Sequence, residues 1–529
     1  MKAGQLQYQH SSWASMVSQA VNRSVAYGSH RSAIFASIDE GEQPIFRFLL
    51  DASWGSHNHV ADMVWASGRK NDSRLISVSH EYILVYARDR ESLRTHGIRW
   101  RQRKPGLDDI YACHKRLKRR HGDDYAAIER DLKEWFRSLP GSHPARRQKH
   151  YNRVDARGVY FPDNISWPGT GGPRYDVIHP VTEKPTKVPA AGWRLKEETM
   201  KRWIAEDRIH FGEDEHSVPK RKSYLREHEH EVPYSVFYQD GRAATKRLRA
   251  VLGTDDVSYP KDETVIAECI EMAAGAGSTI LDYFAGSGTT GHAAINLNRE
   301  DGGRRKFILV EMGHRFDTEI MPRLKKVAFS PEWRNGAAKR EATAEESERG
   351  PRIIKYFRLE SYEDALNNIE FEEVEESLFE LEDYLLRYML QWETKASATL
   401  LNVAAFARPF DYKLRLGGNG DGADETVDLA ETFNYLLGLK VHARRTYDDD
   451  GRRYLVYAGE TWDGSSAVII WRDTEGWTAE DRERDRDFVA RHDMTAGADE
   501  IWMNGDSMVK DARPLDALFK QRMFASADG

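Results

Sequence analysis

A glycine-rich turn between two predicted strands is the part of the sequence best suited to chemistry. Residues 278–292 read STILDYFAGSGTTGH, with glycines at 286, 288 and 291. Gly286 and Gly288 would let the backbone approach a ligand closely at the carboxyl end of a strand. The next predicted strand, Phe307–Glu311, ends in a carboxylate that can accept both hydroxyls of a ribose. This spacing predicts a nucleotide-type binding site.

Two familiar nucleotide-binding loops fit these residues less well. A phosphate-binding P-loop needs a Gly-Lys pair, and the chain contains no Gly-Lys dipeptide. The lysine that would contact the phosphates of ATP is therefore missing, which disfavours ATP hydrolysis. A dinucleotide-binding loop would use Gly291 as its third glycine, but the turn opens with Phe284-Ala285 instead.

The elements that position the turn can be predicted from hydrophobic periodicity. Apolar residues recur at helical spacing between Val265 and Ala273, which predicts an amphipathic helix. Thr279–Phe284 is a short apolar run typical of a buried parallel strand, and Thr290–Asn298 is predicted as a helix. The order helix, strand, turn, helix, strand predicts one half of a Rossmann-like α/β fold.

The motifs around the turn carry a family resemblance. Residues 282–292, with 296–300 (NLNRE) and 308–312 (ILVEM), resemble the S-adenosylmethionine-binding motif of beta-group DNA adenine-N6 methyltransferases. They are especially similar to the modification subunits of type III restriction systems. Residues 259–261 (YPK) match the remaining cofactor motif, placed before the glycine turn as in the permuted (beta) order. The resemblance covers almost the whole chain and is weakest between 90 and 180.

This resemblance implies S-adenosyl-L-methionine as the cofactor. Phe284, Gly286 and Gly288 are expected to surround its methionine moiety, and Glu311 is expected to hold the adenosyl ribose. The predicted cofactor-binding residues are Tyr259, Pro260, Lys261, Asp282, Phe284, Gly286, Gly288, Thr289 and Glu311.

The catalytic residues cannot be assigned from the sequence. Methyl transfer to an exocyclic amine requires the base to leave the duplex stack and its nitrogen to be aimed at the methyl carbon. In this family an Asp/Asn/Ser-Pro-Pro-aromatic loop does that work, and the sequence has no Pro-Pro pair. The nearest string is Ser330-Pro-Glu-Trp333, after the cofactor turn, and the next is Glu231-Val-Pro-Tyr234.

The front of the chain departs from the family in a second way. The missing loop is expected shortly before residues 8–13, and the helical pattern of Val17, Val21 and Val25 is weakened by Gly28 and by polar residues. We therefore expect a chain that has lost its front end and is impaired in methylation when alone.

The charge distribution predicts a nucleic-acid partner. Residues 91–250 carry 34 Lys+Arg against 23 Asp+Glu, whereas residues 331–529 carry 26 against 42, although the whole chain has a net charge of -7. Basic clusters can neutralise phosphates, but a charge run is also typical of a solvated helix face. The predicted DNA-binding residues are Arg99, Arg101, Arg103, Lys104, Lys115, Arg116, Arg119, Lys220, Arg221 and Lys222.

These observations predict an α/β, Rossmann-like methyltransferase domain in permuted order, with an inserted target-recognition region and a C-terminal α+β domain. In the last of these, amphipathic helices are predicted over Tyr362–Thr394, followed by strand-like runs near residue 440 (LGLKV) and at 453–457, the latter after a turn at 449–451. The predicted parts are 1–90 (truncated catalytic half of the methyltransferase domain), 91–250 (basic target-recognition region), 251–330 (cofactor-binding part), 331–350 (linker) and 351–529 (acidic assembly domain).

Composition excludes several other classes. Two cysteines are too few for a disulfide framework or a thiolate zinc site, and the alternating His and Glu residues around His228 lack a third well-spaced ligand, so no metal is expected. No apolar run approaches the length of a membrane span and the first residues lack a signal-peptide core, which predicts a cytoplasmic protein with no membrane partner.

The sequence thus favours a site-specific methyltransferase that acts on adenine N6 in duplex DNA within a restriction-modification system. The expected partners are double-stranded DNA, a second modification subunit in a homodimer, and a restriction subunit. The alternative is a non-catalytic cofactor- and DNA-binding remnant or specificity subunit. A small-molecule methyltransferase also fits the glycine turn but leaves the basic middle unexplained.

Overall fold

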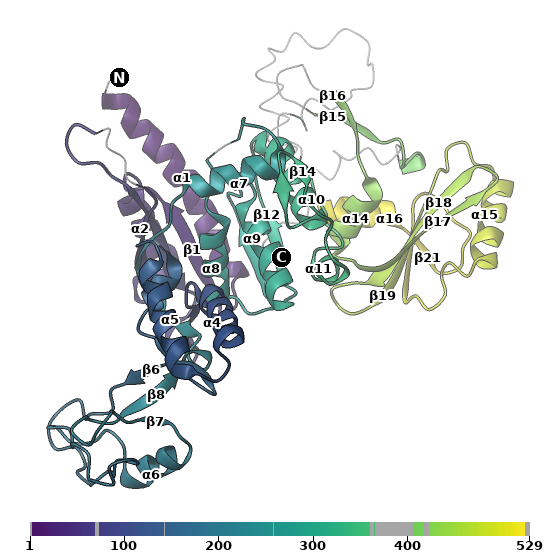
Figure 1. Ribbon diagram of the computed structural model, residues 1–529. Coiled ribbons are helices and arrows are strands. Elements are labelled where there is room, and N and C mark those ends of the chain that lie inside the picture. Colours follow the sequence, from purple (N-terminus) through teal and green to yellow (C-terminus); the bar gives the residue numbers. More distant parts are fainter. Residues whose placement is uncertain are drawn as a thin grey trace. The chain divides into compact units, whose positions relative to one another are not determined.

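The computed structural model (Figure 1) describes most of the chain. The described residues are 3–68, 73–141, 143–257, 259–359, 364, 406–416 and 423–523. The helices predicted over Tyr362–Thr394 lie outside the described residues, except for Asp364. The chain divides into two compact units, residues 1–354 (unit 1) and residues 355–529 (unit 2), which are described separately.

The first sheet of unit 1 is mixed, with strand order β1-β3-β2-β10. Its strands are β1 (Ala33–Ile38), β3 (His80–Ala87), β2 (His59–Ala66) and β10 (Val236–Tyr238). β3 runs antiparallel to β1 and to β2, and β10 runs parallel to β2. Residues 83–87 of β3 are all buried, as expected for a strand that is covered on both faces.

Two helices cover one face of this sheet. α1 (Ala3–Tyr27) and α2 (Gln43–Leu50) pack their apolar sides together over the sheet, and Val17 and Val21 are buried in that cluster. The predicted weakening of the first helix is therefore wrong. α1 runs without interruption to Tyr27, and Gly28 lies past its end, where it does not disturb the helical hydrogen bonds.

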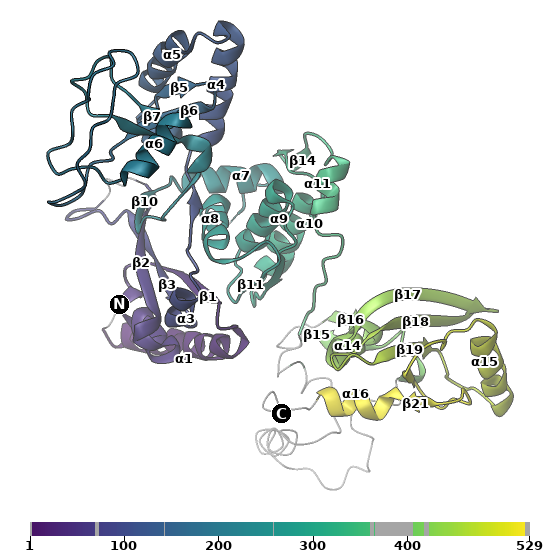
Figure 2. The same cartoon turned by 90° about the horizontal axis from the view of Figure 1, so that it is seen from below.

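Helix α8 (Glu263–Ala273) covers the other face and joins the sheet to the glycine turn. Val265 and Cys269 pack against Trp65 and its neighbours on the sheet, whereas Ile270 packs against the helix that follows the turn. The amphipathic helix predicted here is confirmed, and it lies between the sheet and the helix that follows the turn (Figure 2).

The glycine turn lies in the predicted succession of elements, which is confirmed. The strand β11 (Thr279–Asp282) is followed by α9 (Thr289–Asp301), β12 (Lys306–Leu309) and α10 (Met321–Phe329). β11 and β12 are parallel, with Thr279 opposite Lys306 and Asp282 opposite Leu309.

The burial predicted for this strand is wrong on one face. Alternate side chains of the β11–β12 pair pack inward, but Leu281 is 37% exposed, and Ile308 and Val310 on β12 and just after it are also exposed. The reason is that the helices α8, α9 and α10 pack against the face that carries Ile280, Phe307 and Leu309, so the side chains of the opposite face stay exposed.

The region between β3 and β10 forms a separate group of elements. Its helices are α3 (Arg90–Thr95), α4 (Leu107–His121), α5 (Tyr125–Ser138) and α6 (Glu197–Ala205). Its strands are β4 (Gln102–Arg103), β5 (Arg153–Asp155), β6 (Gly158–Asp163), β7 (Ile209–His210), β8 (Lys220–Tyr224) and β9 (His230–Glu231). α4 and α5 pack together over an antiparallel sheet of order β5-β6-β8-β7, with Ile110, Ile128 and Leu132 fully buried between them.

The stretch predicted as a linker has regular structure. Residues 331–350 contain β13 (Trp333–Arg334), β14 (Ala337–Ala338) and α11 (Ala344–Arg349). They pack onto α7 (Arg242–Leu252) and α9, with Lys326 donating to the carbonyls of Val251 and Gly336. Polar composition suggested a linker, but here the polar side chains pair with one another, as Arg340 does with Glu332 and Glu346.

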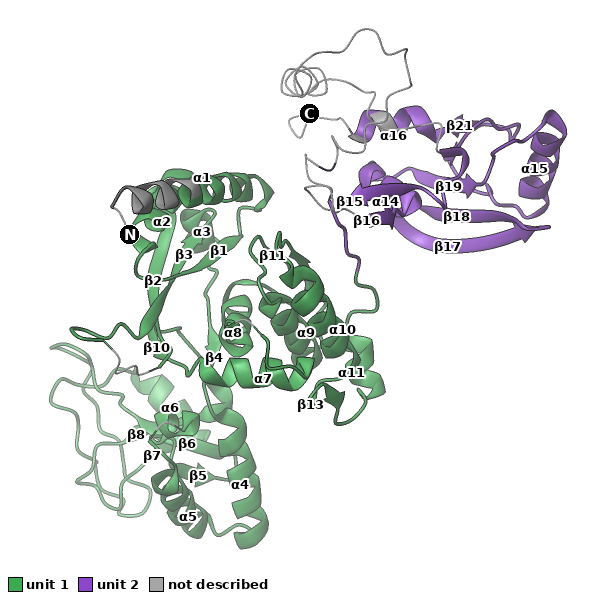
Figure 3. Cartoon of the chain, turned by 90° about the horizontal axis from the view of Figure 1, so that it is seen from above, with its two compact units in different colours: residues 1–354 green, residues 355–529 purple. Residues whose placement is uncertain are grey.

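Unit 2 (Figure 3) contains a five-stranded sheet of order β17-β18-β19-β20-β21. The strands are β17 (Lys440–Asp449), β18 (Arg452–Glu460), β19 (Ser466–Arg472), β20 (Glu500–Met503) and β21 (Ala512–Pro514). The first three are antiparallel and the last three are parallel. A hairpin of β15 (Lys413–Leu416) and β16 (Ala423–Thr426) precedes them.

Helices cover both faces of the unit 2 sheet. α14 (Leu429–Leu437) and α16 (Leu515–Met523) cover one face, and α15 (Ala479–Arg491) covers the other. The predicted turn at 449–451 is confirmed, with positive φ at Asp450 and Gly451. The strand predicted near residue 440 begins only at Lys440, because α14 continues to Leu437 and ends there at a left-handed glycine.

Among the helices that the structure describes, none combines the length and the apolar character needed to cross a membrane.

Candidate functional site

Asp282 fixes the geometry of the glycine turn from its first residue. One carboxylate oxygen accepts the backbone N–H of Phe284 at 3.1 Å, and the other accepts the hydroxyl of Thr290 at 2.5 Å. The backbone N–H of Ala285 also donates to the carbonyl of Val310, which ties the turn to the end of β12. Asp282 therefore shapes the site through intramolecular bonds.

The first two glycines serve backbone conformation and the third serves packing. Gly286 has a φ of +54° and Gly288 a φ of +76°, both in the left-handed region that side chains disfavour. A side chain on Gly291 would instead meet Leu324, since its Cβ would lie 2.7 Å from Cδ2 of that residue. Gly291 thus lets α9 lie close to α10.

Glu311 is brought directly to the turn. One carboxylate oxygen accepts the N–H of Gly286 at 2.8 Å, and the other accepts the N–H of Gly313 at 2.9 Å. A carboxylate has about four lone-pair sites, so both oxygens can still accept hydroxyl donors from a ligand. Two residues that are 25 positions apart in the sequence therefore form one polar edge.

Apolar and aromatic side chains lie exposed beside this edge. Phe284 is 53% exposed and Met312 is 89% exposed, although both are large and hydrophobic. Isolated exposed apolar residues are ordinary, but Phe284 precedes Gly286 by two residues and Met312 follows Glu311 directly, and Gly286 and Glu311 are hydrogen-bonded to each other. An apolar ring of a ligand can be packed here, next to the carboxylate.

The segment 259–261 is attached to both halves of unit 1. Tyr259 is fully exposed, whereas the ammonium of Lys261 forms an ion pair with Glu81 on β3 and lies 5.9 Å from the ring centroid of Trp65. The carbonyl of Lys261 accepts the hydroxyl of Thr289 at 3.4 Å. The sequence-predicted segment and the glycine turn are therefore in contact, with Pro260 between the exposed tyrosine and the paired lysine.

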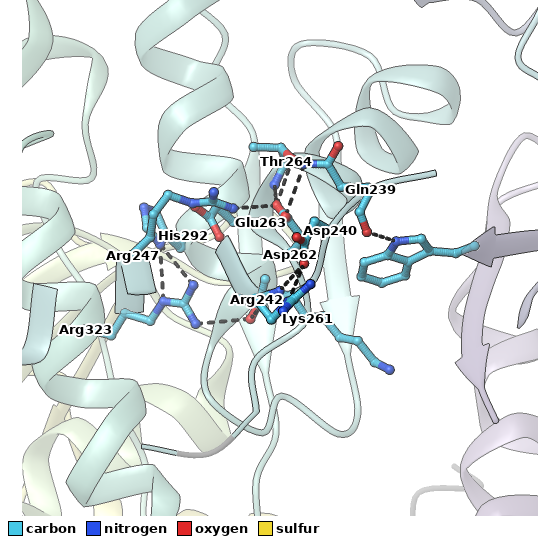
Figure 4. A network of polar contacts seen from close by, with 12 residues as sticks. Gln239, Asp240, Arg242, Arg247, Lys261, Asp262, Glu263, Thr264, His292 and Arg323 are labelled. Atoms are coloured by element: carbon cyan, nitrogen blue, oxygen red, sulfur yellow. Dashed lines mark hydrogen bonds and ion pairs between the residues drawn. The ribbon is translucent and has the colours of Figure 1, made fainter. Parts of the chain in front are cut away.

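Behind the turn lies a polar network that the sequence did not indicate (Figure 4). Arg323 and His292 are both buried and are hydrogen-bonded to each other. Burial and the charge of Arg323 hold the pKa of His292 well below its ordinary value, so this imidazole is neutral. In the sequence, Arg323 is one of several basic residues in a helical run, and no spacing signal marks it as buried.

The predicted DNA-binding residues fall into two groups. Lys115, Arg116 and Arg119 are exposed on α4, and Arg99 and Lys220 are exposed elsewhere in the same region. The others are partly or wholly committed within the protein. Lys222 is buried between Asp155 and Asp207, Arg221 pairs with Asp163, Arg103 pairs with Asp108, Lys104 donates to Tyr151, and Arg101 donates to the carbonyl of Trp100.

The string at Ser330–Trp333 has a structural role. Ser330 is fully buried, its hydroxyl donates to the carbonyl of Arg340 at 2.6 Å, and the indole of Trp333 donates to the carbonyl of Ser330 at 2.8 Å. Its polar groups are satisfied within the 331–350 hairpin, so they are not presented to a ligand.

Comparison with known proteins decides the family. Residues 5–321, more than half of the chain, match the family described as DNA methylase. The chain belongs to the DNA methylase family.

Individual relatives agree with this assignment. The chain is 32% identical over 313 residues to the Mod subunit of the type III restriction-modification enzyme EcoP15I from Escherichia coli, covering 57% of this chain and 46% of that protein. It is 25% identical over 305 residues to the StyLTI Mod subunit from Salmonella typhimurium, covering 57% of this chain and 40% of that protein. It is also 25% identical over 318 residues to the type II methyltransferase M.KpnI from Klebsiella pneumoniae, covering 58% and 68%. The chain spans about half the length of the Mod subunits that it matches.

Proposed function

We propose that this chain is the modification component of a restriction-modification system, that it binds S-adenosyl-L-methionine and duplex DNA for methylation of adenine N6, and that it is impaired in this methylation when alone. The observation that carries the proposal is the hydrogen bond from the N–H of Gly286 to Glu311, in a member of the DNA methylase family. This bond joins the glycine turn to the carboxylate that lies two residues beyond the next strand, as a nucleoside-containing cofactor requires.

The residues around the turn fit this cofactor. The free lone pairs of Glu311 suit a ribose diol, the exposed ring of Phe284 and the open backbone of Gly286 suit the methionine moiety, and the exposed thioether of Met312 suits an apolar contact with the adenine. When bound, S-adenosylmethionine supplies a methyl group on a sulfonium whose leaving thioether is neutral. Asp282 and Thr289 act within the protein, one by shaping the turn and the other by anchoring it to Lys261.

The DNA surface that we propose is built on the exposed basic residues of the inserted region. Lys115 and Arg119 lie one turn apart on α4, where both are exposed and can contact phosphates. Arg116 beside them is also exposed, and it donates to the thiol of Cys113. Lys222 and Arg221 support this region by pairing with acidic neighbours.

The methyltransferase fold that we propose has permuted order, with the elements of residues 1–90 before the inserted region and the cofactor-binding part after it. The separate group of elements between β3 and β10 supports such an insertion. The acidic unit 2 would serve assembly with a second modification subunit and a restriction subunit, in the cytoplasm.

A second candidate rests on the absence of any Pro-Pro pair in the 529 residues. In this alternative the chain is a cofactor- and DNA-binding component without turnover. Both candidates share the cofactor site, and they differ in whether the base-holding loop acts with it.

Calorimetric titration with S-adenosylhomocysteine tests the shared part. We expect saturable 1:1 binding by the whole chain, and a dissociation constant that rises by about tenfold or more in Glu311→Gln, because a hydrogen bond to a charged acceptor is weakened. Glu198→Gln, an exposed glutamate on α6, is the matched control and is expected to leave binding unchanged. Absence of binding by the unmodified chain, or equal binding by Glu311→Gln, would contradict the proposal.

A further inference from the structure

A buried arginine contacts the glycine turn from inside the protein. Arg323 on α10 is 1% exposed. Its guanidinium donates to the carbonyl of Ser287, to the hydroxyl of Ser287 and to the hydroxyl of Thr289, each at 3.0 Å. It also donates to Nδ1 of His292 from two nitrogens, at 3.2 and 3.1 Å (Figure 4). These five contacts all fall on residues 287–292.

The partners in these hydrogen bonds are neutral, which is unusual for a buried cation. Burial lowers the pKa of the Arg323 guanidinium to about 10, and the charges of Glu263 and Glu319 partly offset that effect. A buried charge is costly unless it is paired or fully hydrogen-bonded. A helix that needed only to pack on α9 would be served better by an apolar side chain at this position.

The acceptors that Arg323 satisfies exist because of the shape of the turn. Positive φ values at Gly286 and Gly288 turn oxygens of Ser287 and Thr289 into the protein, where Ser287 and Thr289 are both buried. Buried oxygens without donors would favour another backbone conformation of the turn. The guanidinium, with five N–H donors in one plane, can satisfy several of them together.

We propose that Arg323 is a positioning residue of the cofactor site, which holds residues 284–289 in the conformation that presents Gly286 and Glu311 to S-adenosylmethionine. The proposal rests on the proposed function of the turn. It assigns to the arginine a role through the turn and no contact with the cofactor.

A second set of contacts extends this support to the other cofactor segment. The hydroxyl of Thr289 accepts from Arg323 and donates to the carbonyl of Lys261. Next to Lys261, Asp262 is fully buried and accepts from Arg247 of α7 at 2.7 Å, and Arg247 also pairs with Glu263 (Figure 4). Thr289 is thus the link between the two segments, and Arg323 fixes its orientation.

Substitution of two buried arginines separates positioning from general stability. Arg323→Met removes every donor, and Arg323→Lys keeps a charge with fewer donors. Arg299→Met is the matched control, since Arg299 is also buried, lies on α9 and donates to the carbonyl of Ala328 rather than to the turn. Binding of S-adenosylhomocysteine is measured by calorimetry, together with the thermal midpoint of each variant.

We expect the dissociation constant to rise by about tenfold or more in Arg323→Met and by a smaller factor in Arg323→Lys, as a partial rescue. In Arg299→Met the dissociation constant should stay within about twofold of that of the unmodified chain, even if the thermal midpoint of this variant falls as much as that of Arg323→Met. An Arg323→Met variant that binds within about twofold of the unmodified chain would overturn the proposal.

Hydrogen exchange of the ligand-free proteins keeps this test independent of the proposed function. The amides of residues 284–289 should exchange about tenfold faster in Arg323→Met than in the unmodified chain, and should be unchanged in Arg299→Met. If the unmodified chain binds no S-adenosylhomocysteine, the proposed function fails, but the exchange rates still decide whether Arg323 holds the turn. Equal exchange in Arg323→Met and the unmodified chain would overturn the positioning role.

Discussion

Charged side chains contact adjacent residues of the glycine turn and do different work there. Glu311 accepts from the backbone of Gly286 and keeps lone pairs for a ligand, whereas Arg323 donates to Ser287 and Thr289 from within the core. The turn is therefore held by a carboxylate that accepts backbone N–H groups and by a guanidinium that donates to one backbone carbonyl and to side chains. At Glu311 and Arg323 the number of hydrogen bonds that the side chain can form matters as much as its charge.

The lowered pKa of His292 predicts that the stability of the protein depends on pH. Its folded-state pKa is lowered well below the ordinary value of about 6.5, so between these two pKa values the unfolded chain binds more protons than the folded chain. Stability should therefore fall as the pH drops below about 6.5, by up to about 1.4 kcal/mol per pH unit from this group.

The measurement compares urea unfolding at pH 7 and pH 5 for the unmodified chain and for His292→Asn, which keeps an acceptor for Arg323. The unmodified chain should lose about 2 kcal/mol more than the variant over this interval. Other histidines with lowered pKa values, such as His210, titrate in both proteins and cancel in the comparison. Identical pH dependence in the two proteins would show that His292 is not held neutral.

At the scale of elements, we predict that the β13–β14 hairpin docks on α7 through the close approach of Gly336 and Gly253. Gly253 ends α7 with a left-handed backbone, and a Cβ there would lie 2.8 Å from the Cα of Gly336 in the hairpin. Gly253→Ala should destabilise unit 1 by about 2–4 kcal/mol, because left-handed strain and a backbone clash add.

Gly302 gives the matched comparison. It ends α9 with the same left-handed conformation, but a Cβ there would meet nothing closer than 3.7 Å. Gly302→Ala should therefore cost only the strain, about 1–2 kcal/mol. Thermal unfolding of both variants measures the difference, and equal losses would mean that the hairpin does not rest on Gly253.

Helix α4 is the element that the DNA proposal depends on. Lys115→Gln with Arg119→Gln should lower the slope of log K against log salt by about 2, since each phosphate contact contributes about 0.9. The control is the pair Lys440→Gln and Arg445→Gln, which are exposed on β17 of unit 2. Fluorescence anisotropy with duplex DNA over a range of salt gives the slopes, and equal slopes for the two double variants would remove α4 from the interface.

The elements around the turn were predictable because they depend on local patterns. Helical spacing from Val265 to Ala273 predicts α8, and glycines after an apolar run predict the turn between β11 and α9. What could not be predicted depends on tertiary contacts. Leu281 is apolar yet partly exposed, and Arg323 is charged yet buried, because each environment is set by elements that are distant in the sequence.

In the basic region, too, the sequence could not predict which side chains of the candidate DNA-binding surface are exposed. Composition placed Lys115 and Lys222 in one predicted surface, but only the first is exposed, since Lys222 lies between Asp155 and Asp207. Likewise, the polar residues of 331–350 suggested a linker, and their pairing across a hairpin depends on geometry that composition does not carry.

At the scale of the whole molecule, the net charge of -7 is the sum of two unlike parts. Residues 91–250 are basic and residues 331–529 are acidic, so the average hides a surface suited to a polyanion. The family match, residues 5–321, covers the basic part and the glycine turn, whereas all of unit 2, residues 355–529, lies beyond it. Cofactor and DNA would therefore both be bound within unit 1.

The most direct test of this account is incubation of the purified 529-residue chain with methyl-labelled S-adenosylmethionine and duplex DNA. Label retained on the protein by rapid filtration and label incorporated into DNA are counted in the same sample. We predict cofactor retention near one equivalent, abolished by excess S-adenosylhomocysteine, with little or no label in the DNA, because the chain has the glycine turn that we propose binds the cofactor and its sequence contains no Pro-Pro-aromatic loop. Failure to retain the cofactor, or efficient methylation of the DNA by this chain alone, would contradict the account.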